Sequence, residues 1–135
     1  MARVYVDTSA FYPLLVHAEE DHVRAREVFE RLRDEAARLV ANSFVVLETV
    51  SLLQRRWGIE AVRDWERRME PLVEIEWVDA ETYRRAMVAL LASADRHISL
   101  TDCSSFETIR QAKIERVFSF DRHFRNRGFE LLPGD

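Results

Sequence analysis

The sequence has few of the residues that cross-link small proteins. Cys103 is its single cysteine, which excludes an internal disulfide framework, leaves no cysteine cluster for zinc and fits a reducing compartment. The four histidines form no H-E-x-x-H pattern, so a zinc hydrolase of that type is not expected. We therefore expect a fold that is stabilised by a hydrophobic core.

Long apolar runs are also missing. No stretch approaches the ~18 residues of a membrane span, and the N-terminus lacks the apolar segment of a signal peptide. Glycine and proline occur only three times each, and no repeat or low-complexity segment indicates a linker. We expect one domain over residues 1–135, because this length can bury a proper core. From the missing apolar runs we expect a cytoplasmic protein without a membrane partner.

Lysine is nearly absent, and the chain has a formal net charge of −4. An acidic balance argues mildly against a general nucleic-acid binder, for which a basic surface is usual. Apart from Lys113 the cations are arginines, found in pairs at 55–56, 67–68 and 84–85 and in a cluster at 122, 125 and 127. Paired arginines fit phosphate, but they equally fit exposed helix faces, so they do not define a binding surface.

Short apolar runs alternate with stretches of helical periodicity. The spacing predicts strands over 4–6, 39–41, 73–77 and 117–120, a weaker strand over 129–132, and helices over 9–17, 21–37, 43–57, 59–70, 80–96 and 101–113. Such alternation is typical of an α/β fold with a mainly parallel sheet. We expect helix caps at Thr8 or Ser9, at Ser43 and at Asp79, and a break at Gly58.

Four carboxylates stand where a surface acid would be out of place. Asp7 ends the run Val-Tyr-Val, Glu48 interrupts an apolar helical stretch, Asp102 follows Ser-Leu-Thr, and Asp121 closes Val-Phe-Ser-Phe. Ligands of open parallel sheets gather outside the carboxyl ends of the strands, and Asp7 and Asp121 both follow a predicted strand directly. We expect Glu48 and Asp102 to reach the same edge from helices, Asp102 in a first turn that favours negative charge.

The three aspartates also have ordinary explanations when each is taken alone. Asp7 fits a helix cap, Asp121 fits a turn ahead of Arg-His-Phe, and Asp102 fits the first turn of a helix. The joint explanation is better, because the α/β topology independently brings Asp7 and Asp121 to one edge.

Glu48 is the hardest acid to explain structurally. At ~100° per residue it shares a helix face with Phe44, Val45 and Leu52. A purely structural Glu48 would therefore be a buried glutamate, and it would need a cation such as the arginine at 55 or 56.

A cluster of these acids would require a cation. Carboxylates held together repel one another and raise one another's pKa unless a positive charge lies between them. Mg²⁺ or Mn²⁺ is the natural choice, because hard divalent ions take oxygen ligands, and one ion or two both fit. Such a site activates a water, orients a phosphodiester and neutralises charge on the leaving oxygen.

The residues around these acids resemble the PIN domain, and more closely the VapC-type toxins of bacterial and archaeal toxin–antitoxin pairs. The resemblance is carried, in order, by Val-Tyr-Val-Asp-Thr-Ser, the helical glutamate, Ser-x-x-Asp followed by Cys-Ser-Ser-Phe, and Ser-Phe-Asp-Arg-His-Phe. It extends from the first predicted strand to Phe124, which is nearly the whole chain.

The resemblance implies a three-layer α/β/α fold with a small parallel sheet and a metal-dependent endoribonuclease that hydrolyses RNA with a metal-bound water. It also implies a homodimer and an antitoxin protein that occupies the active site. The catalytic and metal-binding residues that it implies are Asp7, Glu48, Asp102 and Asp121, with Thr8 and Ser99 as supporting hydroxyls.

Other chemistries stay open. A magnesium-dependent phosphatase or phosphotransfer protein would use Asp7 as its nucleophile, although such families usually place a second acid nearby. A domain that binds RNA or protein without cutting would have little need for four acids. A helix-borne apolar face could nevertheless serve a partner or a second copy, although an ordinary core explains the same residues; it consists of Trp57, Trp65, Leu52 and Leu53. Cys103 has no histidine at a diagnostic spacing, so thiol catalysis is not expected.

Overall fold

The protein folds around a parallel sheet that is covered by helices. The computed structural model describes residues 2–134, and within them the sheet has five strands in the order β3-β2-β1-β4-β5, all parallel. The strands are β1 (Arg3–Val6), β2 (Arg38–Asn42), β3 (Val73–Glu76), β4 (Arg116–Phe118) and β5 (Glu130–Leu132). The predicted α/β class with its three-layer arrangement is confirmed.

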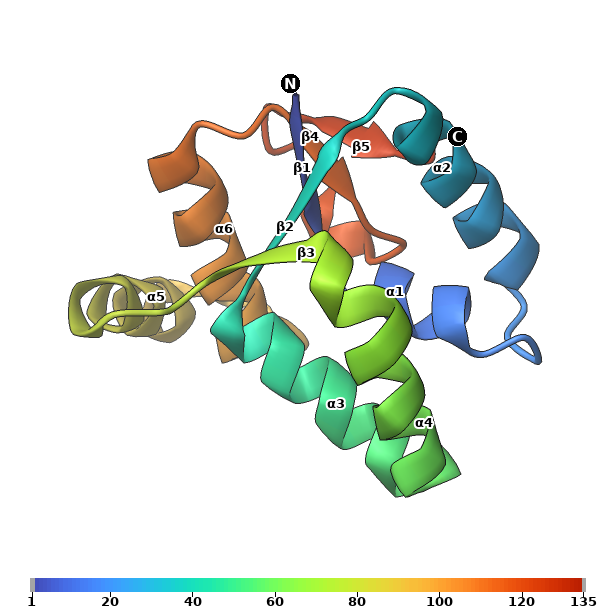
Figure 1. The fold of residues 1–135 in the computed structure, drawn as a ribbon. Helices are drawn as coiled ribbons and strands as arrows, with labels where there is room; N and C mark the ends of the chain where they lie inside the picture. The colour runs from blue at the N-terminus through green and yellow to red at the C-terminus, as the bar shows by residue number, and fades with distance from the viewer. Residues whose placement is uncertain (1, 135) are drawn as a thin grey trace.

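The helices are α1 (Thr8–Leu15), α2 (His22–Asp34), α3 (Ser43–Trp57), α4 (Ile59–Asp64), α5 (Ala80–Ala92) and α6 (Leu100–Ala112). Helices α5 and α6 lie on one side of the sheet and α1 and α2 on the other, while α3 runs along the end at which β1 and β2 finish (Figure 1). No helix of residues 2–134 is long and apolar enough to cross a bilayer. A single domain over 1–135 stays a prediction.

Several predicted helix boundaries were wrong. The segment 59–70 starts as α4, becomes a π-helix, η1 (Trp65–Met69), and ends as a 3₁₀ turn, η2 (Glu70–Leu72). Trp65 and Met69 are both buried in this stretch, and Pro71 prevents regular continuation. Helix α5 stops at Ala92 instead of Arg96, because the next residues form side-chain-stabilised turns around Asp95.

Two predicted caps were displaced by one residue. Helix α1 is capped by Asp7 instead of Thr8 or Ser9, and α3 by Asn42 instead of Ser43. In both cases the capping side chain belongs to the last residue with extended backbone, directly before the helix. Asp79 caps α5 as predicted, and Gly58 separates α3 from α4 with a positive φ of 86°.

A buried polar network fastens α6 to the sheet. The Tyr5 hydroxyl donates to Ser105 Oγ at 2.8 Å, and Asn42 Nδ2 donates to Ser104 Oγ and Thr108 Oγ1, both at 3.1 Å. Buried polar groups are tolerated when they are paired in this way. The network matters for function because α6 carries Asp102 in its first turn.

The apolar core contains part of the face that the sequence offered as a partner surface. Trp65 and Leu53 are each only 1% exposed, and Trp65 packs edge-on against Phe11 with ring centroids 5.0 Å apart. Trp57 is 53% exposed, and its indole nitrogen donates to the Tyr12 hydroxyl. The ordinary core therefore accounts for Trp65 and Leu53 but not for Trp57.

Candidate metal centre

The carboxyl ends of β1 and β4 bring the first and last predicted acids to one edge of the sheet. The register pairs Val6 with Phe118, and the next residue along, Asp7, donates its backbone N–H to the Phe118 carbonyl at 3.0 Å. Asp121 follows β4 by three positions, ahead of the 3₁₀ turn η3 (Arg122–Phe124). The expectation that parallel topology delivers Asp7 and Asp121 to the same edge is confirmed.

Asp7 is almost fully buried, with 3% of its surface exposed. Its Oδ2 accepts from the Ser9 hydroxyl at 2.7 Å, the Ser9 backbone N–H at 3.2 Å and the Ser119 hydroxyl at 3.3 Å. Burial raises its pKa to about 6; the hydrogen bonds from Ser9 oppose that rise, and the charges of Asp102 and Asp121 add to it. Asp7 therefore caps α1, and burial together with the nearby acids disfavours its ionised form.

Ser9 and Ser119 hold the two strand ends together, a role that the sequence analysis missed. Their hydroxyls lie 3.1 Å apart, the Ser9 hydroxyl also accepts from the Phe120 N–H at 2.9 Å, and the Ser119 hydroxyl accepts from the Asp121 N–H at 3.0 Å. The sequence offered only one signal for this link: Ser9 lies two positions after Asp7, and Ser119 lies two positions before Asp121. That spacing is typical of turns and alone does not indicate a link between them.

Asp102 reaches the same region from the first turn of α6. It forms a capping box with Ser99: Asp102 Oδ2 accepts from the Ser99 N–H at 3.0 Å, and Ser99 Oγ accepts from the Asp102 N–H at 3.0 Å. Burial raises the pKa of Asp102, the Ser99 N–H lowers it, and the charge of Asp121 raises it again, with a raised pKa as the net result. The predicted supporting hydroxyl Ser99 thus contacts the acid beside it.

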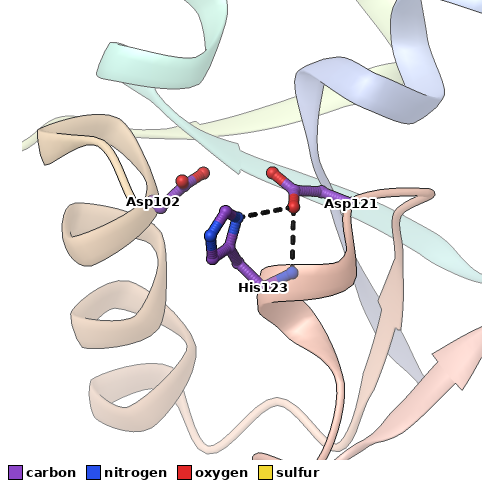
Figure 2. Close-up of side chains that lie close together, drawn as sticks. All are labelled: Asp102, Asp121 and His123. Atoms are coloured by element: carbon purple, nitrogen blue, oxygen red, sulfur yellow. Dashed lines mark hydrogen bonds and ion pairs between the residues drawn. The ribbon is translucent and has the colours of Figure 1, made fainter. Parts of the chain in front are cut away.

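Asp121 is joined to a histidine that the sequence analysis did not select. Its Oδ1 accepts from the His123 backbone N–H at 2.9 Å and contacts His123 Nδ1 at 2.8 Å, as Figure 2 shows. One potential ligand atom from each of Asp102, Asp121 and His123 lies within 4.8 Å of the others. In Figure 2 the Asp102 carboxylate points across the gap towards Asp121.

Glu48 lies on α3 as an exposed residue, unlike its buried neighbour Val45. Its pKa is raised, first by partial burial of the carboxyl group and then by Asp102 and Asp121, while the hydroxyls of Thr8 and Thr101 lower it. Since the residue as a whole is exposed, water screens much of this effect. A buried, structurally paired Glu48 is therefore not what the fold provides, and within residues 2–134 no ion pair joins it to an arginine.

The second predicted hydroxyl, Thr8, is turned towards α3. Its Oγ1 lies 3.1 Å from Thr49 Oγ1 and 3.4 Å from the Val45 carbonyl oxygen. The Thr8 hydroxyl also lowers the pKa of Glu48. Thr8 therefore links the start of α1 to α3, the helix that carries Glu48.

The arrangement suits a hard cation. Within residues 2–134 every hydrogen bond to the Asp7 carboxylate goes to Oδ2, and no buried side-chain polar atom lacks a partner, so Oδ1 is accessible. The raised pKa values of Asp7, Glu48 and Asp102 each include repulsion from another acid of this set. A divalent cation among oxygen donors would relieve that repulsion. Asp7 and Glu48 do not belong to the group of Asp102, Asp121 and His123 whose ligand atoms lie within 4.8 Å of one another. They are nevertheless close enough for the charges of Asp102 and Asp121 to raise their pKa values.

Known proteins share this fold and sequence pattern. The chain matches the PIN domain over residues 4–130. It is 29% identical over 132 residues to "23S rRNA-specific endonuclease VapC20" of two Mycobacterium tuberculosis strains, covering 96% of this chain and 98% of the relative. The crystal structure of Mycobacterium tuberculosis VapC20, described as a "Sarcin-Ricin loop cleaving toxin", superposes with a TM-score of 0.79 at 30% identity, covering 93% of this chain and 95% of that one.

A more distant structure shares the fold alone. FitAcB from Neisseria gonorrhoeae has a TM-score of 0.63 and 19% identity, covering 87% of each chain. The family match extends over nearly the whole chain and includes all four acids. The chain therefore belongs to the PIN domain family, and it is similar to a VapC toxin from end to end.

Proposed function

We propose that this protein is a metal-dependent endoribonuclease and the toxin component of a toxin–antitoxin pair. It hydrolyses RNA phosphodiesters at Asp7, Glu48, Asp102 and Asp121, with Mg²⁺ or Mn²⁺ as its cofactor. The substrate is single-stranded or loop RNA, because splayed nucleotides expose their phosphodiesters to a surface site.

One observation carries the proposal: acids from the end of β1, from α3, from α6 and from the segment after β4 gather at a single edge of the sheet. The charge of a neighbouring acid helps to raise the pKa of Asp7, Glu48 and Asp102 there. Such crowding is costly without a cation, so a purely structural explanation is poor. The full-length similarity to VapC20, which is named as an endonuclease, adds the reaction class.

The residues divide the work by their positions. Asp7, Asp102 and Asp121 would hold the metal, because the first two are buried and Asp121 is half-buried. A bound Mg²⁺ or Mn²⁺ supplies an activated water and neutralises charge on the phosphate. Glu48, the exposed acid, is the one best placed to meet the water and the substrate. Hydrolysis then needs no covalent enzyme intermediate.

The substrate test follows from the relative's name. Purified protein free of antitoxin is incubated with a hairpin of the 23S rRNA sarcin–ricin loop, a hairpin of the same stem with a scrambled loop, and an unstructured RNA, in Mg²⁺ or Mn²⁺. We expect cleavage of RNA in either metal and none in EDTA. Cleavage that EDTA leaves undiminished would contradict the metal mechanism, and no cleavage of any RNA in either metal would contradict the activity.

The two competing functions give different results in related assays. A phosphotransfer protein would form an acyl-phosphate mimic with beryllofluoride at Asp7, visible by ¹⁹F NMR, whereas the ribonuclease would not. A non-catalytic binding domain would bind the same RNA hairpins and leave them intact in Mg²⁺ and in Mn²⁺.

We also infer that the protein forms a homodimer and binds an antitoxin. Val88 and Leu91 on α5 are 70% and 78% exposed, and Trp77 after β3 is 77% exposed. Val88 and Leu91 are three positions apart and therefore lie on one face of α5, and contiguous exposed apolar surface is typical of a face that a partner covers. Light scattering behind size exclusion should give twice the monomer mass for the free protein, and Leu91→Glu should shift it towards the monomer. A monomeric wild type would contradict the homodimer.

A further inference from the structure

His123 lies between two carboxylates from different parts of the chain. Its Nδ1 is 2.8 Å from Asp121 Oδ1, and its Nε2 is 3.0 Å from Asp95 Oδ2 in the loop between α5 and α6. The side chain of His123 is 13% exposed, compared with 43% for Asp95. Asp95 is itself held by a turn in which its Oδ1 accepts from the His97 N–H at 2.9 Å. The three residues form a chain that runs from the surface to the acidic cluster.

This geometry argues against His123 as a metal ligand, although its ring lies within reach of the cluster. Both ring nitrogens of His123 lie at hydrogen-bonding distance from a carboxylate oxygen, so each already has a partner other than a cation. The same contacts give the ring a different role.

Asp121 is the acid whose orientation this ring controls. Both bonds from His123 go to Oδ1, one from the backbone and one from the ring, and in Figure 2 the other oxygen is turned towards Asp102. Hydrogen bonds to the second oxygen of a ligating carboxylate fix its orientation, and their loss typically weakens metal binding ~10–100-fold.

We propose that Asp95 and His123 are positioning residues that hold Asp121 with one oxygen aimed into the metal centre. The inference rests on the proposed function, in which Asp121 binds the metal. Asp95 fixes the far side of the imidazole, and the imidazole fixes the near oxygen of Asp121. The α5–α6 loop thereby contributes to the site without touching the metal.

Two amide replacements separate the two ends of the ring. His123→Asn places an amide nitrogen near the position of Nδ1, so it keeps the donor to Asp121, whereas His123→Gln places one near Nε2 and loses that donor. Calorimetric titration with Mn²⁺ should give about tenfold weaker binding for His123→Gln and a value within about threefold of wild type for His123→Asn. The matched control is His97→Ala, a solvent-exposed histidine whose side chain lies outside the chain of contacts and which should bind like wild type.

A double variant tests whether Asp95 acts through the ring. Asp95→Ala should weaken Mn²⁺ binding severalfold in the wild type and leave the His123→Gln protein unchanged, since residues that act in one chain are not additive. Urea midpoints in EDTA accompany each titration, so that lost affinity is separated from lost folding: the midpoint of His123→Gln should match that of His123→Asn.

Equal Mn²⁺ affinity for His123→Gln and wild type would overturn the inference, as would equal weakening in His123→Asn. Direct ¹⁴N coupling from imidazole in the pulsed EPR spectrum of the Mn²⁺ protein would show a ligand and would overturn it too. Failure of the wild type itself to bind Mn²⁺ would instead remove the proposed metal centre, so the two failures are distinguishable.

Discussion

Asp7→Asn should stabilise the metal-free protein, and the gain should depend on pH. Asn keeps a carbonyl oxygen for the Ser9 and Ser119 donors, and it remains a good N-cap for α1. What the substitution removes is the negative charge of a group with 3% exposure beside other acids. The same substitution should abolish cleavage, because it removes the negative charge with which the Asp7 carboxylate would bind the metal ion.

The magnitude follows from the pKa of Asp7, which burial raises from 3.8 to about 6. The difference of about 2 corresponds to about 3 kcal/mol of native-state destabilisation by the ionised form. Between these two pKa values the native state binds more protons than the unfolded state, so stability falls as pH rises. The cost is absent below about pH 3 and complete above about pH 7. About 3 kcal/mol is an upper value, because donors bind a neutral amide less strongly than a carboxylate.

Urea denaturation in EDTA at intervals from pH 4 to pH 8 measures this gain. With a slope of about 2 kcal/mol per molar, the midpoint of Asp7→Asn should exceed that of wild type by up to about 1.5 M at pH 8 and by only about 0.3 M at pH 4. Asp79→Asn is the control, since that exposed cap has a pKa lowered by the Thr82 N–H and should gain nothing at high pH. A midpoint difference that does not vary with pH, or a loss at pH 8, would refute the reasoning.

Three further variants test other parts of the structure. Asp102→Asn should abolish cleavage and should leave the urea midpoint in EDTA unchanged or raised, because burial raises the pKa of this acid. It should also reduce the thermal stabilisation by Mg²⁺, and equal stabilisation of the variant and the wild type would contradict a metal role. Asn42→Ala should lower the free energy of unfolding in urea by about 2–4 kcal/mol, because it removes the α3 cap and two buried hydrogen bonds to α6. The loss should exceed that of Ser43→Ala, and a loss below about 1 kcal/mol would argue against the network. Lys113→Gly should raise stability by about 0.5–1 kcal/mol, because this α6 cap has a φ of 55°, and a lower midpoint would contradict it.

The sequence predicted much of the fold because the relevant signals are local. Apolar runs identify β1, β2 and β4, helical periodicity identifies α2, α3 and α6, and their alternation indicates a parallel sheet. Parallel strands end at one edge, so the sequence alone placed Asp7 and Asp121 at the same edge of the sheet. Boundaries were less accurate where two residues compete for one role, as Asn42 and Ser43 do at the start of α3.

The setting of Glu48 shows where helical periodicity is insufficient. Its neighbours on the predicted face range from buried Val45 to half-buried Phe44 and Leu52, whereas Glu48 is exposed. Periodicity defines a face, but it does not define how far along the helix another element covers that face. Here Leu47 and Glu48 are both exposed, so no other element within residues 2–134 covers this part of the α3 surface.

By itself, the sequence determined the α/β class, the order of the four acids and the strand ends that deliver two of them, because each depends on residues close together in the chain. Only the tertiary structure decided that Ser9 and Ser119 join β1 to β4, that Asp95 meets His123, and that Asp102 faces Asp121. These contacts join residues up to 110 positions apart. The residues involved are ordinary turn and cap residues. They are brought together by the sum of many packing contacts, which no local sequence pattern records.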